Sequence, residues 1–95
     1  MTYTEFINSL LDTMPPASAR DYLKVLWFEK KGQWKQSHDI AQEIHNEVGS
    51  RLHAYLHRRE GDNGNARYWY NQAGLPFPKV TMDEEWESMV KEFLG

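Results

Sequence analysis

The sequence contains no cysteine among its 95 residues. Disulfide bonds, thiolate nucleophiles and metal sites with cysteine ligands are therefore excluded. The chain also lacks an apolar run long enough to cross a membrane, and its first segment, MTYTEFINSLLDTMPP, has neither the basic start nor the apolar centre of a secretory signal. We therefore expect a cytoplasmic protein that does not bind membranes.

Positive charge is also scarce. Lysine and arginine number 11 against 14 aspartates and glutamates, which gives a formal net charge of −3. General nucleic-acid binding needs a clustered basic face, so this balance argues against a nucleic-acid partner. The charge is uneven: residues 51–60 carry three arginines and one glutamate, a net +2, whereas residues 83–92 carry five acidic side chains and one lysine, a net −4.

Helical periodicity and aromatic side chains are abundant. Apolar positions recur at spacings of three and four, which is typical of amphipathic helices, and no segment alternates as a strand would. Thr2, Ser18 and Thr81 are each followed three residues later by an acidic residue, the pattern of a helix-starting capping box. Gly49 is expected to end one helix, and Ser50 to cap the next. The sequence predicts six short helices, at about 2–14, 18–30, 37–48, 51–60, 65–72 and 82–94.

These helices predict a single all-α domain over residues 1–95. Four of them would form two stacked antiparallel hairpins, at about 18–48 and about 50–74, between an N-terminal helix and a C-terminal capping helix at about 82–94. The last helix carries an apolar stripe too large to leave in water, so we expect it to dock on the hairpins with its acidic face outward. That stripe consists of Trp86, Met89, Val90, Phe93 and Leu94.

An internal repeat relates the two hairpins. Placing Gly32 on Gly61 aligns LWFEKKGQWKQSHDIAQ with YLHRREGDNGNARYWYN at an offset of 29 residues. The second unit resembles the tetratricopeptide family, in particular short-helix relatives with the pattern A-x-x-W-Y-x-x-A. The residues that carry the resemblance are Ala54, Gly61, Ala66, Trp69, Tyr70, Ala73 and Pro78. The first unit carries it at Phe28, Gly32, Trp34 and Ser37, and departs from it at Ile44.

The resemblance implies a scaffold of helical hairpins that binds a protein or a peptide. The segment HAYLHRREGDNGNARYWYNQAG is also similar to one shared by small uncharacterised bacterial proteins, a similarity that brings no activity with it.

The aromatic run RYWY fits between two small residues of the predicted fifth helix. Ala66 and Ala73 lie two turns apart on one face, where small side chains let a partner helix approach closely. Tyr70, four residues after Ala66, should point inward with it. We expect Trp69 to cover the adjacent sector and Tyr68 to face solvent.

Histidines are the main candidates for chemistry. His53 and His57 are one helical turn apart, and Glu60 follows within reach, so two imidazoles and a carboxylate could hold zinc with a position open for water. His38 lies on the preceding helix. The metalloprotease signature, however, needs a glutamate directly after the first histidine, and this chain has Ala54 there.

A packing role for these histidines is the competing interpretation. His57 stands four residues before Gly61, where the first unit has Phe28 before its own glycine. We therefore predict no metal and no cofactor. The alternative is a small metal- or histidine-dependent enzyme, which would use His38, His53, His57 and Glu60. Histidines that converge in a pocket would favour the enzyme, and histidines buried singly beside aromatic rings would favour the scaffold.

We predict a non-catalytic helical-repeat module that binds a protein or peptide partner. Its binding surface would be the basic fourth helix, which suits an acidic or C-terminal-carboxylate peptide. The residues of that surface are Arg51, His53, His57, Arg58 and Arg59. A third possibility is a self-associating protein, such as a weak homodimer, because two hairpins leave an open apolar end unless it is capped.

Overall fold

A computed structural model describes residues 1–95 and contains six α-helices and no strand, which confirms the all-α prediction. None of the helices combines the length and the apolar character needed to span a bilayer. The helices are α1 (Tyr3–Ser9), α2 (Asp21–Lys30), α3 (Trp34–Gln42), α4 (Glu47–Arg59), α5 (Asn63–Gln72) and α6 (Met82–Leu94).

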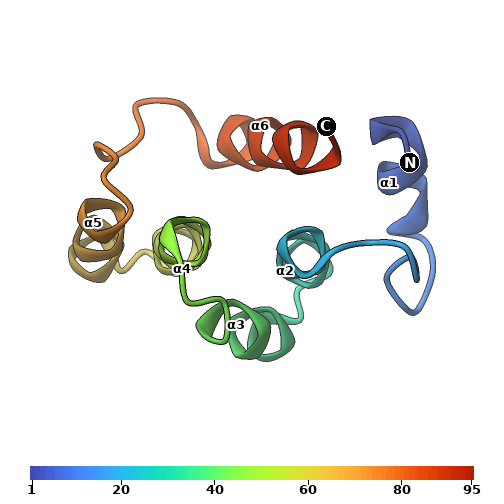
Figure 1. The fold of residues 1–95 in the computed structure, drawn as a ribbon, viewed down its shortest axis with the longest axis horizontal. Coiled ribbons are helices and arrows are strands. Elements are labelled where there is room, and N and C mark those ends of the chain that lie inside the picture. The colour runs from blue at the N-terminus through green and yellow to red at the C-terminus, as the bar shows by residue number, and fades with distance from the viewer.

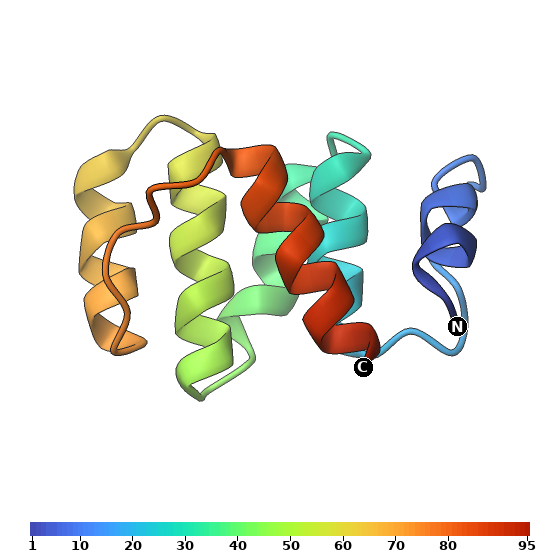
Figure 2. The same cartoon turned by 90° about the horizontal axis from the view of Figure 1, so that it is seen from above.

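Two helical hairpins form the centre of the molecule. Helix α2 pairs with α3, α4 pairs with α5, and α3 also packs against α4. In Figure 1, α5, α4 and α2 lie side by side, with α3 on one side of them and α6 on the other. Figure 2 shows α6 running obliquely over α4 and α2, and α1 standing at the end of the row. The scaffold therefore has one face covered by α6 and an opposite face on which α3 and α5 are exposed.

The two hairpin turns have the same geometry. Gly32 and Gly61 have φ angles of 77° and 80°, a region that favours glycine. The residue after each glycine donates its backbone N–H to a carbonyl five residues earlier, Gln33 to Phe28 and Asp62 to His57. Each turn is thus a Schellman motif that ends one helix and reverses the chain.

The connection between α3 and α4 differs from the prediction. Helix α3 ends at Gln42 rather than at residue 48, and α4 begins at Glu47 with Asn46, not Ser50, as its N-cap. Gly49 lies inside the first turn of α4, where its N–H donates to the Asn46 side chain at 2.9 Å. A Cβ on Gly49 would collide with the backbone oxygen of Ile44, so this glycine serves a close approach of the connection to the helix and not a helix end.

Other helix ends agree with the sequence in part. The capping boxes at Thr2 and Thr81 are confirmed. The first helix, however, ends at Ser9 instead of residue 14, and Ser18 does not cap α2, whose N-cap is Arg20 without a side-chain hydrogen bond. Helix α5 begins at Asn63, two residues earlier than predicted.

The main core lies between α6 and the two hairpins. The α6 residues Trp86, Met89, Val90 and Phe93 are buried against side chains of α1, α2 and α4. The indole Nε1 of Trp86 donates to the backbone oxygen of Leu26 at 3.0 Å, so even its polar atom is satisfied. Helix α6 is therefore an integral part of the core and caps the hairpins.

A second, smaller cluster joins α4 to α5. Ala54, Ala66 and Tyr70 are almost completely inaccessible to solvent, whereas Trp69 is half-buried and Tyr68 is 54% exposed. The orientations expected for the aromatic run are thus confirmed. The two alanines allow the helices to approach closely, and Tyr70 packs beside them.

Enlarging Ala66 should therefore destabilise the protein. Ala66→Leu adds three carbons to a site with no exposed surface, and we expect the free energy of unfolding to fall by about 1–3 kcal/mol. Asn71→Leu, at an exposed position of the same helix, is the matched control and should change it by at most about 0.5 kcal/mol. Urea unfolding measures both, and equal midpoints for the two variants would contradict the packing of α4 on α5.

Candidate functional site

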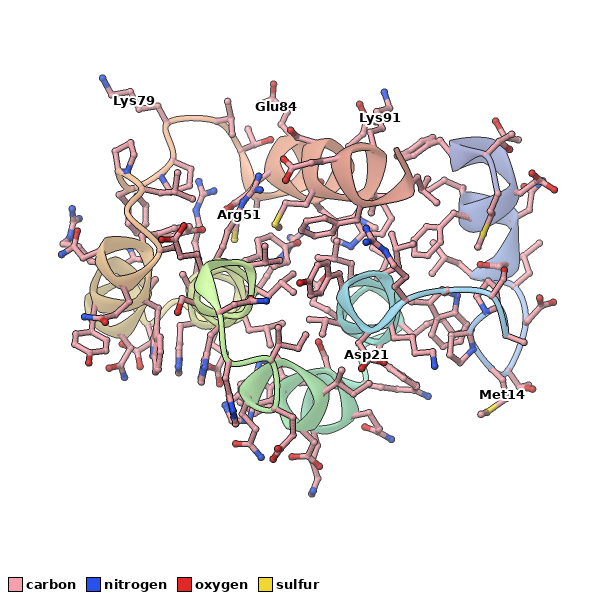
Figure 3. All side chains as sticks on the ribbon, viewed as in Figure 1. Met14, Asp21, Arg51, Lys79, Glu84 and Lys91 are labelled. Carbon is pink, nitrogen blue, oxygen red and sulfur yellow. The ribbon has the colours of Figure 1, made fainter.

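The arginines of the predicted basic surface reach towards α6. Figure 3 shows the side chain of Arg51 extending from α4 towards α6. Its Nη1 lies 3.0 Å from both carboxylate oxygens of Glu92. Nη2 of Arg59 lies 2.6 Å from Oδ1 of Asp83. The positive segment of the sequence therefore pairs with the negative segment of the same chain, and these arginines do not stand free in this structure.

Arg58 takes part in a buried network under α6. Its Nη1 donates to Oε1 of Glu85 at 2.8 Å, and its Nη2 donates to the backbone oxygen of Val80 at 2.6 Å. The other oxygen of Glu85 accepts from the hydroxyl of Tyr70 at 2.6 Å. Burial, followed by this bond to Glu85, raises the pKa of Tyr70. The acidic face of α6 was expected to point outward, but Glu85 is only 5% exposed, because it bonds to Arg58 of α4 and Tyr70 of α5.

Arg59 holds a second polar group between α2 and α4. Its Nε donates to the hydroxyl of Tyr55 at 2.6 Å and lies 3.0 Å from Oε1 of Glu29. Burial raises the pKa of Glu29, against the opposing effect of the guanidinium. These contacts join α2 to α4; they do not form an open site.

Three histidines converge on the opposite side of α4. His53 and His57 project from α4 towards α3, where His38 meets them. Nε2 of His38 lies 3.1 Å from Nε2 of His53, and one ring nitrogen from each of the three residues lies within 4.8 Å of the other two. The structure thus brings together the three histidines that the sequence analysis singled out.

Two tryptophans flank this cluster. Trp34 stacks on His38 with ring centroids 4.6 Å apart, and Trp69 stacks on His53 with centroids 4.3 Å apart and planes within 8°. The ring of His57 is parallel to that of His53, at 5.0 Å. The histidines therefore converge rather than lying singly, and two of them also stack on aromatic rings, so the arrangement combines one feature expected of the enzyme with one expected of the scaffold.

Carboxylates lie beside the third histidine. Nδ1 of His57 is 3.2 Å from Oε1 of Glu60 and 3.9 Å from Oδ2 of Asp62. The contact with Glu60 is not a hydrogen bond, and this buried nitrogen has no hydrogen-bond partner. Glu60 thus lies close to His57 without being hydrogen-bonded to it.

Burial affects the protonation of the cluster. Desolvation, and next the proximity of His38 and His57, lowers the pKa of His53 to about 4. The imidazole of His53 is therefore neutral at pH 7, and one of its nitrogens carries a free lone pair.

A groove of about 430 Å³ lies beside the cluster. The α3–α4 connection forms one wall, the side chains of Trp69 and Gln72 on α5 form the other, and His53 lies between them. The remaining lining residues are Ala41, Gln42, Ile44, His45, Asn46, Glu47, Gly49 and Ser50. Of the five residues predicted to bind a partner, only His53 lines this groove.

Sequence reasoning missed most of the groove because it extended the third helix through residue 48. A continuous helix would include residues 43–46, whereas in the structure they form the connection between α3 and α4. The signal that could have found it is Asn46, a strong N-cap residue placed three residues before Gly49.

Comparison of the chain with models of known protein families, with curated proteins and with solved structures found no significant match.

Proposed function

We propose that the protein is a non-catalytic binding module that takes an extended peptide segment of another protein in the groove between the α3–α4 connection and α5. The observation that carries this proposal is the groove itself, which has the largest volume of the hollows on the molecule and lies on the face that α6 leaves open. Hairpin scaffolds commonly bind partners in hollows between their helices.

The lining of the groove suits a peptide backbone. Gln42 and Gln72 are exposed on opposite walls, and each side-chain amide offers both donors and an acceptor, as a peptide group does. Trp69 and Ile44 are half-buried and supply apolar surface for a side chain between these amides. Polar groups at the rim with an aromatic side chain in the wall are a common arrangement in binding sites.

The other face is a weaker candidate. An acidic peptide bound to Arg51, Arg58 and Arg59 would have to replace the carboxylates of α6, which already occupy these guanidinium groups. Displacing α6 would also expose its buried apolar stripe to water. The proposed partner site therefore moves from the arginines to the opposite side of α4.

Selection from a displayed library of random peptides tests the proposal. Peptides are selected on the wild-type protein and their affinity is then measured for two single variants, Gln42→Arg and Gln72→Arg, each of which places a long charged side chain in the groove. Each variant should bind about tenfold more weakly or worse, a loss of about 1.4 kcal/mol. Gln36→Arg makes the same change at an exposed α3 position outside the groove and should leave the affinity unchanged. Failure to select any peptide, or equal losses in all three variants, would overturn the proposal.

A further inference from the structure

We propose that His38, His53 and His57 form a binding site for a transition-metal dication of the zinc type, with one coordination position left open. This inference departs from the prediction that the protein holds no metal. The proposed metal site does not depend on the proposed peptide groove, because it is inferred from the distances between the histidine ring nitrogens alone.

The spacing of the ligand atoms fits such an ion. Two nitrogens that each lie 2.0–2.1 Å from a tetrahedral zinc are about 3.3 Å apart. Nε2 of His38 and Nε2 of His53 are already 3.1 Å apart, and the third ring nitrogen lies within 4.8 Å of both. A modest rotation of the His57 ring would complete a three-histidine set without moving a helix.

The scaffold holds the ligands on two packed helices. His53 and His57 are one turn apart on α4 and share a face, and α3 packs against α4 and presents His38 to both. All three side chains are partly accessible to solvent, and His53 also lines the groove, so an ion can enter and a fourth ligand can reach it. Ligands on helices are held more firmly than ligands on loops.

A carboxylate stands near one of the proposed ligands, as it does in many histidine metal sites. A metal-bound histidine usually donates its second ring N–H to a carboxylate, which orients the ring and strengthens its basicity. Nδ1 of His57 is buried, lies 3.2 Å from Glu60 and has no hydrogen-bond partner, so Nε2 is the nitrogen left for the ion. Stacking by Trp34 and Trp69 restricts the rings of His38 and His53.

Packing alone is the competing explanation. Neutral imidazoles stack on indoles without any ion, and the 3.1 Å contact between the two Nε2 atoms is then a hydrogen bond whose proton lies on one of the rings. The two explanations differ in one measurable respect: a metal ion replaces that shared proton, and so changes the signals of three ring nitrogens together.

Titration of the chelator-treated protein, without an affinity tag, with Zn²⁺ and Co²⁺ tests the site. We expect one ion per chain, the visible absorption of tetrahedral Co²⁺, and competition between the two ions. His38→Gln and His57→Gln should each weaken binding by about 100-fold or more, and Glu60→Gln by about 10–100-fold. His45→Gln is the matched control: this exposed histidine also lies beside the groove but outside the three-histidine cluster, its ring hydrogen-bonds to the backbone oxygen of Gln42, and its loss should leave binding of the metal ion unchanged.

A measurement on the wild-type chain keeps the test valid if a histidine variant fails to fold. In long-range nitrogen–proton NMR spectra, Zn²⁺ should shift the ring nitrogens of His38, His53 and His57 together and leave those of His45 in place. Absence of stoichiometric binding, binding that survives in His38→Gln, or a response confined to His45 would overturn the proposal.

Discussion

Deletion of residues 82–95 should abolish cooperative unfolding of the remaining chain. The deletion removes four buried apolar side chains of α6, which stabilise the fold by about 1.5–3 kcal/mol each, or roughly 6–12 kcal/mol together. A domain of this size has a total stability of about 5–15 kcal/mol. The deletion also leaves the apolar faces of α2 and α4 uncovered, so we expect a molten or aggregated species.

Circular dichroism during urea unfolding, together with analytical ultracentrifugation, measures this outcome. In the control, Glu87 and Lys91 are both changed to alanine. These two α6 residues are exposed and form an ion pair at the surface. The free energy of unfolding of this variant should therefore stay within about 1 kcal/mol of the parent value. A truncated chain that stays monomeric, soluble and cooperatively folded would mean that α6 is a detachable tail rather than a cap.

Glu85→Ala should lower the free energy of unfolding by about 3–5 kcal/mol, because it leaves Arg58, whose side chain is only 14% exposed, without its counter-charge. The carboxylate joins Arg58 of α4, Tyr70 of α5 and its own helix, so its loss breaks a contact among three helices. Glu85→Gln keeps an acceptor for the Tyr70 hydroxyl but loses the charge opposite Arg58, and its effect should be intermediate.

Glu87→Ala provides the comparison for Glu85→Ala. This exposed carboxylate on the same helix pairs with Lys91 and accepts a hydrogen bond from Tyr3 at the surface, so its removal should cost at most about 1 kcal/mol. Guanidinium unfolding of the three variants ranks them directly. Similar losses for Glu85→Ala and Glu87→Ala would show that Glu85 is not buried as described.

Several features of the helices could be predicted from the sequence, because their physical causes lie within a few residues of the signal. The capping boxes at Thr2 and Thr81, the turn glycines and the apolar stripe of α6 all have their predicted role. Gly49 did not, because the same residue type can end a helix or allow a close backbone approach. Here it is the approach of Ile44 that decides, and that contact depends on the path of the connection.

The candidate site could be predicted only in part. The i, i+4 spacing was enough to place His53 and His57 together, but the 3.1 Å contact with His38 depends on how α3 packs against α4. The same limit applies to charge. The sequence contains a basic and an acidic segment, and only the packing of α6 over α4 shows that Arg58 and Glu85 neutralise each other inside the protein.

The indole signals of the four tryptophans in nitrogen–proton NMR spectra give the most direct test of which face binds a partner. Trp69 lines the groove, whereas Trp86 is buried on the inner face of α6, so each reports on one face. On addition of a peptide selected as above, we predict that the signal of Trp69 moves progressively and that of Trp86 does not. Movement or loss of the Trp86 signal with Trp69 unchanged would show that the partner displaces α6, and would contradict binding in the groove between the α3–α4 connection and α5.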